Sequence, residues 1–495
     1  MLVQEITRNL LIKRSSKTKY TYLGLLFSVY FILWLYRFLR VPPHLRHFRS
    51  VGYFKWMLAC LRKKKPTQRL VFPKNVSTIH KFYLSRLPLT DWILFTLDPE
   101  AVKTILSKTS AFSLNTQTNP LSRLLVQNSL LSVNARKEQR KIMDPAIERI
   151  APVQLLGSLV QKVFRVIEQE TNQTVKIIDL MYRLTLDALG HTVFNFDFES
   201  LDKPKKIEWI QMYTDTSCSR LDWLLRHVPF KRRRFLKSVD RLNELFLSVT
   251  EKRRQEIHSK KYDPRPDNEK DLLTLVLESE IREEGCIQNE EIKCNLASVF
   301  VNGHETTSHA LGCCLYYLAY DKIIQNKARQ EVIRILGDEK KDVIPTVEDC
   351  NSMVYLDMLI KESLRRFGMP LFTSPHRMEQ DTFIGKVLIP QGTSVSIDLH
   401  ALHHDPQLWE EPYKFNPERF APGGEYDQME KENGYTFVPF CHGDGMDLSM
   451  TEQRVTLAMM LRKYLIELPV DSIHKGGVQI DMTPHTLLLQ FDKRY

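Results

Sequence analysis

One stretch of the sequence combines a glycine, an acid and two hydroxyls at helical spacing. Residues 301–307 read Val-Asn-Gly-His-Glu-Thr-Thr and lie within a long run that contains no proline. Gly303 and Thr306 stand three residues apart, so they share one face of the predicted helix. A glycine beside hydroxyls leaves a dent in that face, and Glu305 could deliver protons to an occupant of the dent. Taken alone, the pattern is also typical of a helix kink or of close helix packing.

A second constellation pairs one carboxylate with two guanidinium groups. Glu362 and Arg365 stand three residues apart, which makes them neighbours on a helix. A buried pair of this kind needs further hydrogen-bond partners. Arg419, in the turn Phe-Asn-Pro-Glu-Arg-Phe over residues 415–420, is available as one of them. Each of these patterns alone is common in proteins.

A thiol and an imidazole follow an apolar strand near the C-terminus. Residues 437–443 read Phe-Val-Pro-Phe-Cys-His-Gly, and a helix is predicted over residues 450–464. Cys441 is the only cysteine in this part of the chain. A small buried residue is the simplest interpretation of such a cysteine.

In this order and at these separations, the four segments resemble those of the cytochrome P450 family of haem-thiolate monooxygenases. They match the family's oxygen-binding helix (AGxETT), its ExxR helix, its PERF meander and its haem loop (FxxGxRxCxG). The resemblance covers essentially the whole chain, and the combination is far more specific than any single motif. It implies a fold that is mainly α with small β-sheets, formed by one large domain over residues 41–495.

The resemblance also implies roles for individual residues. Thr306 would lie beside bound dioxygen, and Glu305 would help to deliver protons to it. The residues expected to form a structural network under the haem are Glu362, Arg365 and Arg419. The residues expected to bind the haem cofactor are Arg140 together with His376 or Arg377.

The haem loop departs from the family pattern. The residues up to Gly443 match its beginning and those from Asp444 match the part after the ligand, so four residues, x-Arg-x-Cys, are missing between them. The missing cysteine supplies the thiolate that holds the iron and pushes electron density toward the O–O bond. Cys441 is the candidate substitute metal ligand, although it stands two residues too far from the following helix, and His442 is a further candidate. Asn302 replaces a small residue over the oxygen side.

An uncharged apolar stretch near the N-terminus predicts a membrane anchor over residues 1–40. Tyr20 to Tyr36 contains 17 residues without a charge, and a helix of that length spans about 25 Å. This is just under the ~30 Å of a bilayer core, and basic residues on both sides could close the difference. Tyrosine and tryptophan stand near both ends, as in an interfacial belt. The alternatives are a cleaved signal peptide or a buried core helix.

Composition and charge narrow the class of protein further. The chain has 495 residues and a formal net charge of +11, and its eight cysteines form no CxxC or zinc-finger spacing. Scattered cysteines of this kind are typical of reduced thiols in a protein that faces the cytosol. The basic runs at 62–65 and 231–234 suit anionic headgroups, whereas no motif indicates nucleic acid.

Strands are predicted at 477–482 and 486–491, and a hairpin at 387–397 around residues 390–392.

Three interpretations of the function follow. The first is a single-pass membrane monooxygenase, which the resemblance places in the endoplasmic reticulum with its domain facing the cytosol. Such an enzyme inserts one oxygen atom from O2 into an apolar small molecule, with electrons from an NADPH-dependent reductase. The second is a catalytically degraded member that acts as a membrane-tethered binding protein. The third is a gene-model artefact of an active enzyme, in which the four missing residues were lost.

Overall fold

The structure is a computed structural model. It describes residues 40–50, 81–86, 91–107, 112–114, 137–149, 152–203, 229–260, 264–282, 285, 287–432, 434–441, 446–476 and 486–495, and most of 22–30. The predicted anchor therefore lies largely outside the described residues. Within the described part of the chain, no helix is both long enough and apolar enough to cross a membrane.

Helices make up most of the described chain, as predicted. The α-helices are α5 (Pro99–Ser107), α7 (Lys137–Arg149), α8 (Val153–Gln169), α9 (Ile177–Leu189), α12 (Pro229–Lys260), α13 (Leu272–Ile281), α14 (Asn289–Tyr320), α15 (Lys322–Leu336), α16 (Val347–Ser352), α17 (Val354–Phe367), α18 (Leu399–His403), α19 (Glu425–Glu432) and α20 (Met446–Lys463). Shorter turns are η1 (Pro43–Leu45), η3 (Thr171–Gln173), the π-helical η4 (Gly190–Phe194), η5 (Asp267–Glu269) and η6 (Pro417–Phe420).

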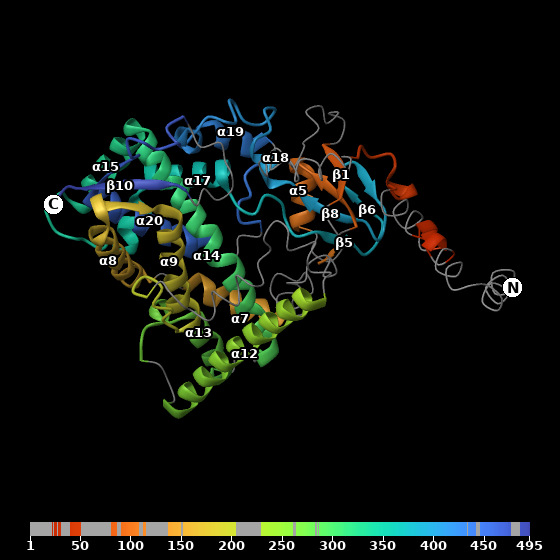
Figure 1. The fold of residues 1–495 in the computed structure, drawn as a ribbon, viewed down its shortest axis with the longest axis horizontal. Helices are drawn as coiled ribbons and strands as arrows, with labels where there is room; N and C mark the ends of the chain where they lie inside the picture. Colours follow the sequence, from red (N-terminus) through yellow and green to blue (C-terminus); the bar gives the residue numbers. More distant parts are fainter. Residues whose placement is uncertain are drawn as a thin grey trace.

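Helix α14 organises the helical part of the molecule. It packs along α9 and also contacts α12, α17 and α20, and Figure 1 shows it running through the middle of this part. Gln288 and Glu291 form a capping box at its start. Asp321 ends it and caps the next helix, because its carboxylate accepts hydrogen bonds from the backbone N–H groups of Ile323 and Ile324. The long run without proline around residues 301–307 thus forms the helices α14 and α15.

Three small sheets accompany the helices. The strands are β1 (Phe82–Arg86), β2 (Trp92–Thr96), β3 (Phe112–Leu114), β4 (Thr174–Lys176), β5 (His376–Met378), β6 (Thr382–Ile384), β7 (Val387–Ile389), β8 (Ser394–Ile397), β9 (Tyr464–Glu467) and β10 (Leu488–Lys493). The five-stranded sheet has the order β1-β2-β8-β5-β3, the three-stranded sheet β4-β10-β9 and the two-stranded sheet β6-β7. Only β2 and β8 run parallel to each other.

The predicted hairpin over residues 387–397 is wrong in its pairing. Both of its strands exist as β7 and β8, but β7 pairs with β6 across the turn at Gly385, whereas β8 joins β2 and β5. Gly385 has a φ of 57°, a left-handed conformation that glycine adopts without strain, so the tight turn forms there. The predicted strand at 486–491 is present as β10, and the one at 477–482 lies outside the described residues.

The chain that follows the predicted anchor is fixed to the five-stranded sheet. The indole Nε1 of Trp92 donates a hydrogen bond to the carbonyl oxygen of Arg40, at 3.1 Å. The backbone N–H of Leu84 donates to the carbonyl oxygen of Arg49, at 2.8 Å. Leu45 is buried between strands β1 and β2 and helix α5 in one apolar cluster. The domain thus begins with a segment whose position is set by the sheet.

Buried thiols lie in the helical core. Cys313 and Cys314 of α14 and Cys350 of α16 are buried and not joined in disulfides. Burial raises the pKa of the Cys314 thiol to about 12 and that of Cys350 to about 11, and it also raises the pKa of Cys313. Raised pKa values keep these sulfurs as neutral thiols.

Candidate functional site

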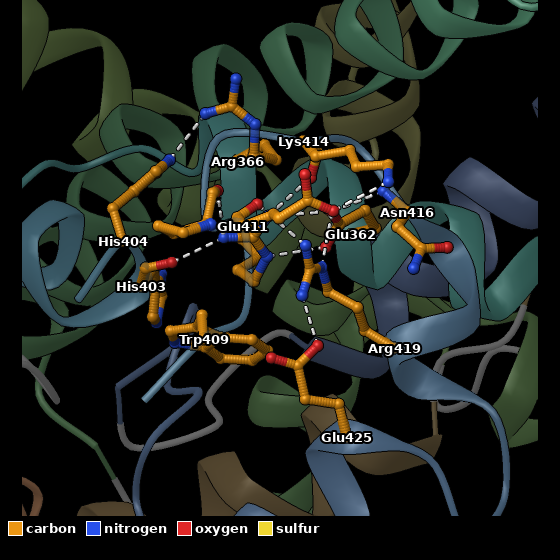
Figure 2. Close-up of polar contacts among 12 residues, drawn as sticks. Glu362, Arg366, His403, His404, Trp409, Glu411, Lys414, Asn416, Arg419 and Glu425 are labelled. Atoms are coloured by element: carbon orange, nitrogen blue, oxygen red, sulfur yellow. Dashed lines mark hydrogen bonds and ion pairs between the residues drawn. The ribbon is translucent and has the colours of Figure 1, made fainter. Parts of the chain in front are cut away.

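Glu362 and Arg365 form a fully buried ion pair on α17. The Nε of Arg365 donates to Oε2 of Glu362 at 2.7 Å, and Nη2 donates to Oε1 at 2.9 Å. Neither side chain is exposed to solvent. Their spacing of three residues on a helix permits this two-pronged contact, and Figure 2 shows Glu362 among the polar residues that surround it.

The remaining donors of Arg365 hold the segment between α18 and η6. Its Nη1 donates to the carbonyl oxygens of His403 and Pro412, at 2.7 and 2.9 Å. Its Nη2 also donates to the carbonyl oxygen of Lys414, at 3.3 Å. All five guanidinium hydrogens thus have acceptors. The guanidinium also lies over the Trp409 ring, 5.0 Å from its centroid.

Arg419 completes this group from the turn η6, and we call the set of Glu362, Arg365 and Arg419 the buried network. The Nε of Arg419 lies 3.6 Å from Oε1 of Glu362, an ion-pair distance rather than a hydrogen bond. Its Nη2 donates to the carbonyl oxygen of Glu411 at 3.0 Å, and its Nη1 contacts the carboxylate of Glu425. The structure therefore brings together the three residues that the sequence predicted for this role.

Two buried histidines, His403 and His404, and the partly buried His400 lie beside the buried network, and the sequence analysis did not single them out. Arg366 donates to Nε2 of His404 at 2.7 Å, while Nδ1 of His404 donates to the carbonyl oxygen of His400 at 2.8 Å. Nε2 of His403 accepts a hydrogen bond from the backbone N–H of Val438 at 3.2 Å. Desolvation is the main cause that lowers the pKa of His400 to about 4 and of His403 to about 3; that of His404 falls well below its usual value. Their spacing of three and four residues, at 400, 403 and 404, could have indicated in the sequence that the three side chains lie together on one helical turn.

Helix α14 presents an amide and a hydroxyl on one side. The Thr306 hydroxyl donates to the carbonyl oxygen of Asn302 at 2.5 Å, and the Asn302 amide donates to that of Ser298 at 2.8 Å. Asn302 is exposed and Thr306 is partly exposed. A Cβ placed at Gly303 would come 3.0 Å from the side chain of Leu189 on α9. The glycine thus allows close packing of α9 on α14, which is one of the alternatives left open for this motif, and the dent beside Thr306 stays a prediction.

The other side of the same turn holds His304 in one tautomer. Its Nδ1 donates to the carbonyl oxygen of Phe300 at 2.5 Å, so its Nε2 is free of a proton and accepts from the Tyr182 hydroxyl at 3.1 Å. Burial and then the charge of Glu305 raise the pKa of Tyr182. Glu305 therefore lies close enough to Tyr182 of α9 for their charges to interact.

A polar seam joins α14 to the start of α20. The hydroxyls of Thr307 and Ser449 lie 3.0 Å apart, and the Gln453 amide donates to Ser449 at 3.3 Å. Beside this seam, Glu452 is buried and its Oε1 has no hydrogen-bond partner, as is true of Oε1 of Gln453 and the hydroxyl of Thr456. Burial raises the pKa of Glu452 to about 8, so this carboxyl is mostly protonated at neutral pH.

The remaining residues predicted to bind the haem or its iron belong to separate elements of the fold. Arg140 on α7 is 3.6 Å from Asp144 and about a third of its side chain is exposed. His376 is buried on β5 of the five-stranded sheet, while its neighbour Arg377 is exposed. Cys441 is partly buried against the apolar cluster of the sheet domain, in a left-handed conformation with a φ of 52°. The predicted junction of Gly443 and Asp444, together with His442, lies outside the described residues.

The chemistry of the donor set decides whether these residues fit a thiolate-bound haem. The iron needs a deprotonated cysteine, yet the sequence has no cysteine after Cys441. Cys313, Cys314 and Cys350 are buried with raised pKa values, which disfavours a thiolate at each of them. Among the described residues, no group of three or more His, Cys, Asp or Glu could hold a metal ion. The described residues fit the framework around a haem, these three thiols do not suit its thiolate, and Cys441 stays the candidate ligand predicted from the sequence.

Comparisons with known proteins agree with this framework. A family model described as "Cytochrome P450" matches residues 56–490. The chain is 25% identical to human "Cytochrome P450 4F8" in an alignment 466 positions long that covers 88% of this chain and 88% of that one. It is 28% identical to the cytokinin hydroxylase of Arabidopsis thaliana over 329 residues, 64% of this chain and 61% of that one.

A solved structure shows the same fold. The crystal structure of the "cytochrome P450DA heme domain" matches with a TM-score of 0.70 and 21% sequence identity, over 84% of this chain and 90% of that one. Haem is the cofactor that the family and this neighbour imply, and oxygen insertion by a haem-thiolate enzyme is the general activity that the family supports. The family model covers most of the chain, and the chain therefore belongs to the cytochrome P450 family.

Proposed function

We propose that the chain binds an apolar small molecule on the scaffold of a membrane-anchored monooxygenase, and that in its printed form it does not complete oxygen insertion. The observation that carries this proposal is the haem loop, which lacks the segment x-Arg-x-Cys between Gly443 and Asp444. The scaffold itself supports binding, since the buried network and the polar face of α14 are both in place.

The loss falls on one step of the family's chemistry. A cysteine thiolate anchors the iron and donates the electron density that favours O–O cleavage. A carboxylate or an imidazole in its place would give a different potential and no such donation. Binding of an apolar molecule does not require the thiolate, because burial of apolar surface drives it. The proposal therefore separates binding, which remains, from oxidation, which does not.

The proposed partners follow from the family and from the N-terminal segment. An NADPH-dependent reductase would supply electrons to an active form, and the anchor would hold the domain at the cytosolic side of the endoplasmic reticulum. The described residues between 22 and 30 are helical, and they include five exposed apolar side chains. These are Tyr22, Leu25, Leu26, Val29 and Tyr30. Exposed apolar helix of this kind is suited to lipid.

Deletion of residues 1–40 tests the anchor. We expect most of the truncated chain to leave the membrane fraction. High salt should strip the remainder that basic residues hold on anionic lipid, since such attraction is screened within about 10 Å at 0.1 M. Full retention of the truncated chain in high salt would contradict the anchor as the main attachment.

A second candidate function is an active monooxygenase that uses Cys441 as its metal ligand. The observation in its favour is position, because Cys441 directly follows the segment Phe437–Phe440 that precedes the family's haem loop and is only partly buried. The left-handed φ of 52° at this residue is uncommon for a side chain of its type and indicates a constrained turn.

A carbon-monoxide difference spectrum of the reduced full chain distinguishes the two functions. The proposed binding protein gives no thiolate-type Soret band, yet it still binds an apolar dye. The second candidate gives the band, and Cys441→Ser abolishes it. A band that survives Cys441→Ser would contradict both functions, because no other cysteine lies near the loop in the sequence.

A further inference from the structure

One buried guanidinium on α17 lacks the acceptors that its neighbours have. The side chain of Arg366 belongs to a residue that is only 6% exposed, and its Nε has no hydrogen-bond partner in the described chain. Its Nη1 donates to Nε2 of His404 at 2.7 Å, a contact that Figure 2 shows. A buried donor without an acceptor costs free energy, and the cost is larger when the group is charged. Arg366 therefore needs a further acceptor.

The groups that surround Arg366 do not compensate its charge. The hydroxyl of Tyr317 on α14 and the ring of His404 both interact with it. Both are neutral, because burial raises the pKa of Tyr317 to about 12 and lowers that of His404 well below its usual value. Glu362 acts on the pKa of Arg366, but its two oxygens are hydrogen-bonded to Arg365. Neutral partners therefore leave this guanidinium with an unpaired charge.

The charges of the whole region lead to the same conclusion. Three arginines lie together in this part of the described chain, and two carboxylates pair with them. The arginines are Arg365, Arg366 and Arg419, and the carboxylates are Glu362 and Glu425. One positive charge thus remains without a partner of opposite sign, and a buried charge in this state is costly.

Arg329 of α15 shows how the fold accommodates another buried arginine that has no carboxylate. Its Nε donates to the carbonyl oxygen of Leu461 at 3.0 Å, and its Nη2 donates to that of Tyr464 at 2.8 Å. Among the described residues, no backbone carbonyl accepts a hydrogen bond from Arg366. The chain thus supplies Arg329 with acceptors that it does not supply to Arg366.

An exposed tyrosine ring separates Arg366 from the solvent. Tyr413 is 67% exposed, and its ring centroid lies 5.7 Å from the guanidinium carbon of Arg366 and 5.2 Å from the ring centroid of His404. A ring face attracts a cation, but it does not replace a negative charge. Arg365 fixes the backbone carbonyls on both sides of Tyr413, so its exposed side chain is the part that can move. Exposed side chains change rotamer within nanoseconds, and a small solute can therefore pass.

We propose that Arg366 binds a small inorganic anion such as chloride, beneath the ring of Tyr413 and beside His404. The anion accepts a hydrogen bond from Nε of Arg366 and supplies the missing negative charge. A single atom suits the site, since a phosphate would bring several oxygens into a region that offers them few donors. The ion would stabilise the contact between α17 and the segment that carries Tyr413. This site lies outside the haem loop, so it depends neither on haem nor on the proposed anchor.

Replacement of gluconate by chloride tests the site in the detergent-solubilised full chain. Thermal unfolding is followed at neutral pH and at constant ionic strength, so that the screening of surface charges does not change. We expect a saturable rise in the unfolding temperature, because an ion that binds only the folded state stabilises it by mass action. The rise should reach roughly 2–3 °C when chloride is a hundredfold above its dissociation constant. The same unfolding temperature in both salts would overturn the site.

Two methionine variants separate the site from general effects of salt. Arg366→Met replaces the guanidinium with a flexible apolar side chain, and removal of an unpaired buried charge should leave the fold intact. We expect this variant to lose the response to chloride. Arg334→Met is the matched control, because its side chain is 73% exposed, and it should keep the response. A response that persists in Arg366→Met, or that both variants lose, would overturn the assignment.

Broadening of the chloride NMR signal measures the binding directly. The parent chain should broaden the signal, and an excess of bromide should reverse the broadening by competing for the site. This measurement needs only the folded parent, so it decides the question even where Arg366→Met does not fold. A signal that the folded parent leaves unchanged, or broadening that bromide does not reverse, would contradict a site for a small anion.

Discussion

The buried network and the first half of α20 differ in how many of their buried polar atoms are paired. Arg365 has an acceptor for each of its donors, and Glu362 receives hydrogen bonds from Arg365 and from the backbone of Asn416, so that only Nε of Arg419 is left with an ion-pair contact in place of a hydrogen bond. Glu452 and Gln453 of α20 each bury a side-chain oxygen that has no hydrogen-bond partner in the described chain. A polar network is stable when all its members are paired and costly when they are not.

The residues that stabilise the fold and the residues expected to carry the reaction lie in different regions of the chain. In the described chain, the partners of the buried network come from α17, α18, η6, α19 and the segments between them, and none comes from the haem loop. The buried end of α20 directly follows the loop that lacks four residues. A chain can therefore retain the family's fold while the region that carries its reaction is incomplete.

Restoring the missing segment should have the largest effect. Insertion of x-Arg-x-Cys between Gly443 and Asp444 returns the thiolate and about 13 Å of extended chain to the loop. We expect a thiolate-type band with carbon monoxide to appear where the printed chain gives none. The control insertion, x-Arg-x-Ser, restores the length without the sulfur and should give no band. A band from the serine control would show that length rather than sulfur was missing.

Glu362→Ala should disrupt the buried network and destabilise the fold. It leaves Arg365 buried without its acid and removes one of the two carboxylates beside Arg419, at a cost of about 3–5 kcal/mol in the free energy of unfolding. Urea unfolding of the full chain measures it. Glu411→Ala is the matched control, because the exposed Glu411 side chain pairs only with Lys414 while its backbone carbonyl still serves Arg419. Equal losses in both variants would contradict the buried network as the source of stability.

Glu452→Gln should make the stability of the α20 region less dependent on pH. The folded-state pKa of Glu452 is about 8, above its usual 4.5, so the stability linked to this group is complete below pH 4.5 and is lost as the pH rises to 8. The amide cannot ionise, so the variant should avoid a loss of about 2–4 kcal/mol between pH 5 and 8. Urea unfolding at the two pH values measures the difference. A parent and a variant with the same pH dependence would count against burial of the acid.

Replacing a histidine beside the buried network should change the free energy of unfolding least. Its pH dependence has the opposite sign to that of Glu452, because stability is lost as the pH falls. His404 is neutral in the fold and its pKa lies well below 6.5, so the unfolded chain takes up a proton first and stability is lost as the pH falls below 6.5. His404→Gln keeps an acceptor for Arg366 and should reduce this slope by up to about 1.4 kcal/mol per pH unit. Unfolding between pH 6.5 and 4.5 measures it. An unchanged slope would show that His404 is accessible to protons in the fold.

The sequence predicted local patterns better than it predicted partners. Spacings of three and four gave α14, α15 and the Glu362–Arg365 pair, since these depend on helix geometry alone. The sequence analysis paired β7 with β8 instead of β6, because strand propensity does not indicate which strand a given strand pairs with. The residue that packs on Gly303, Leu189, lies more than a hundred residues earlier and was not predicted. Such long-range contacts leave no periodic signal in the chain.

The buried thiols of α14 have a consequence for following the molecule in time. Cys313 and Cys314 lie just beyond Ala310, whose carbonyl accepts a hydrogen bond from Ser363 of α17. A thiol reacts with an alkylating reagent as its thiolate and only when the reagent can reach it. Labelling of this pair in the native protein therefore requires transient opening of the packing around α14. The rate of labelling would report local unfolding of this helix.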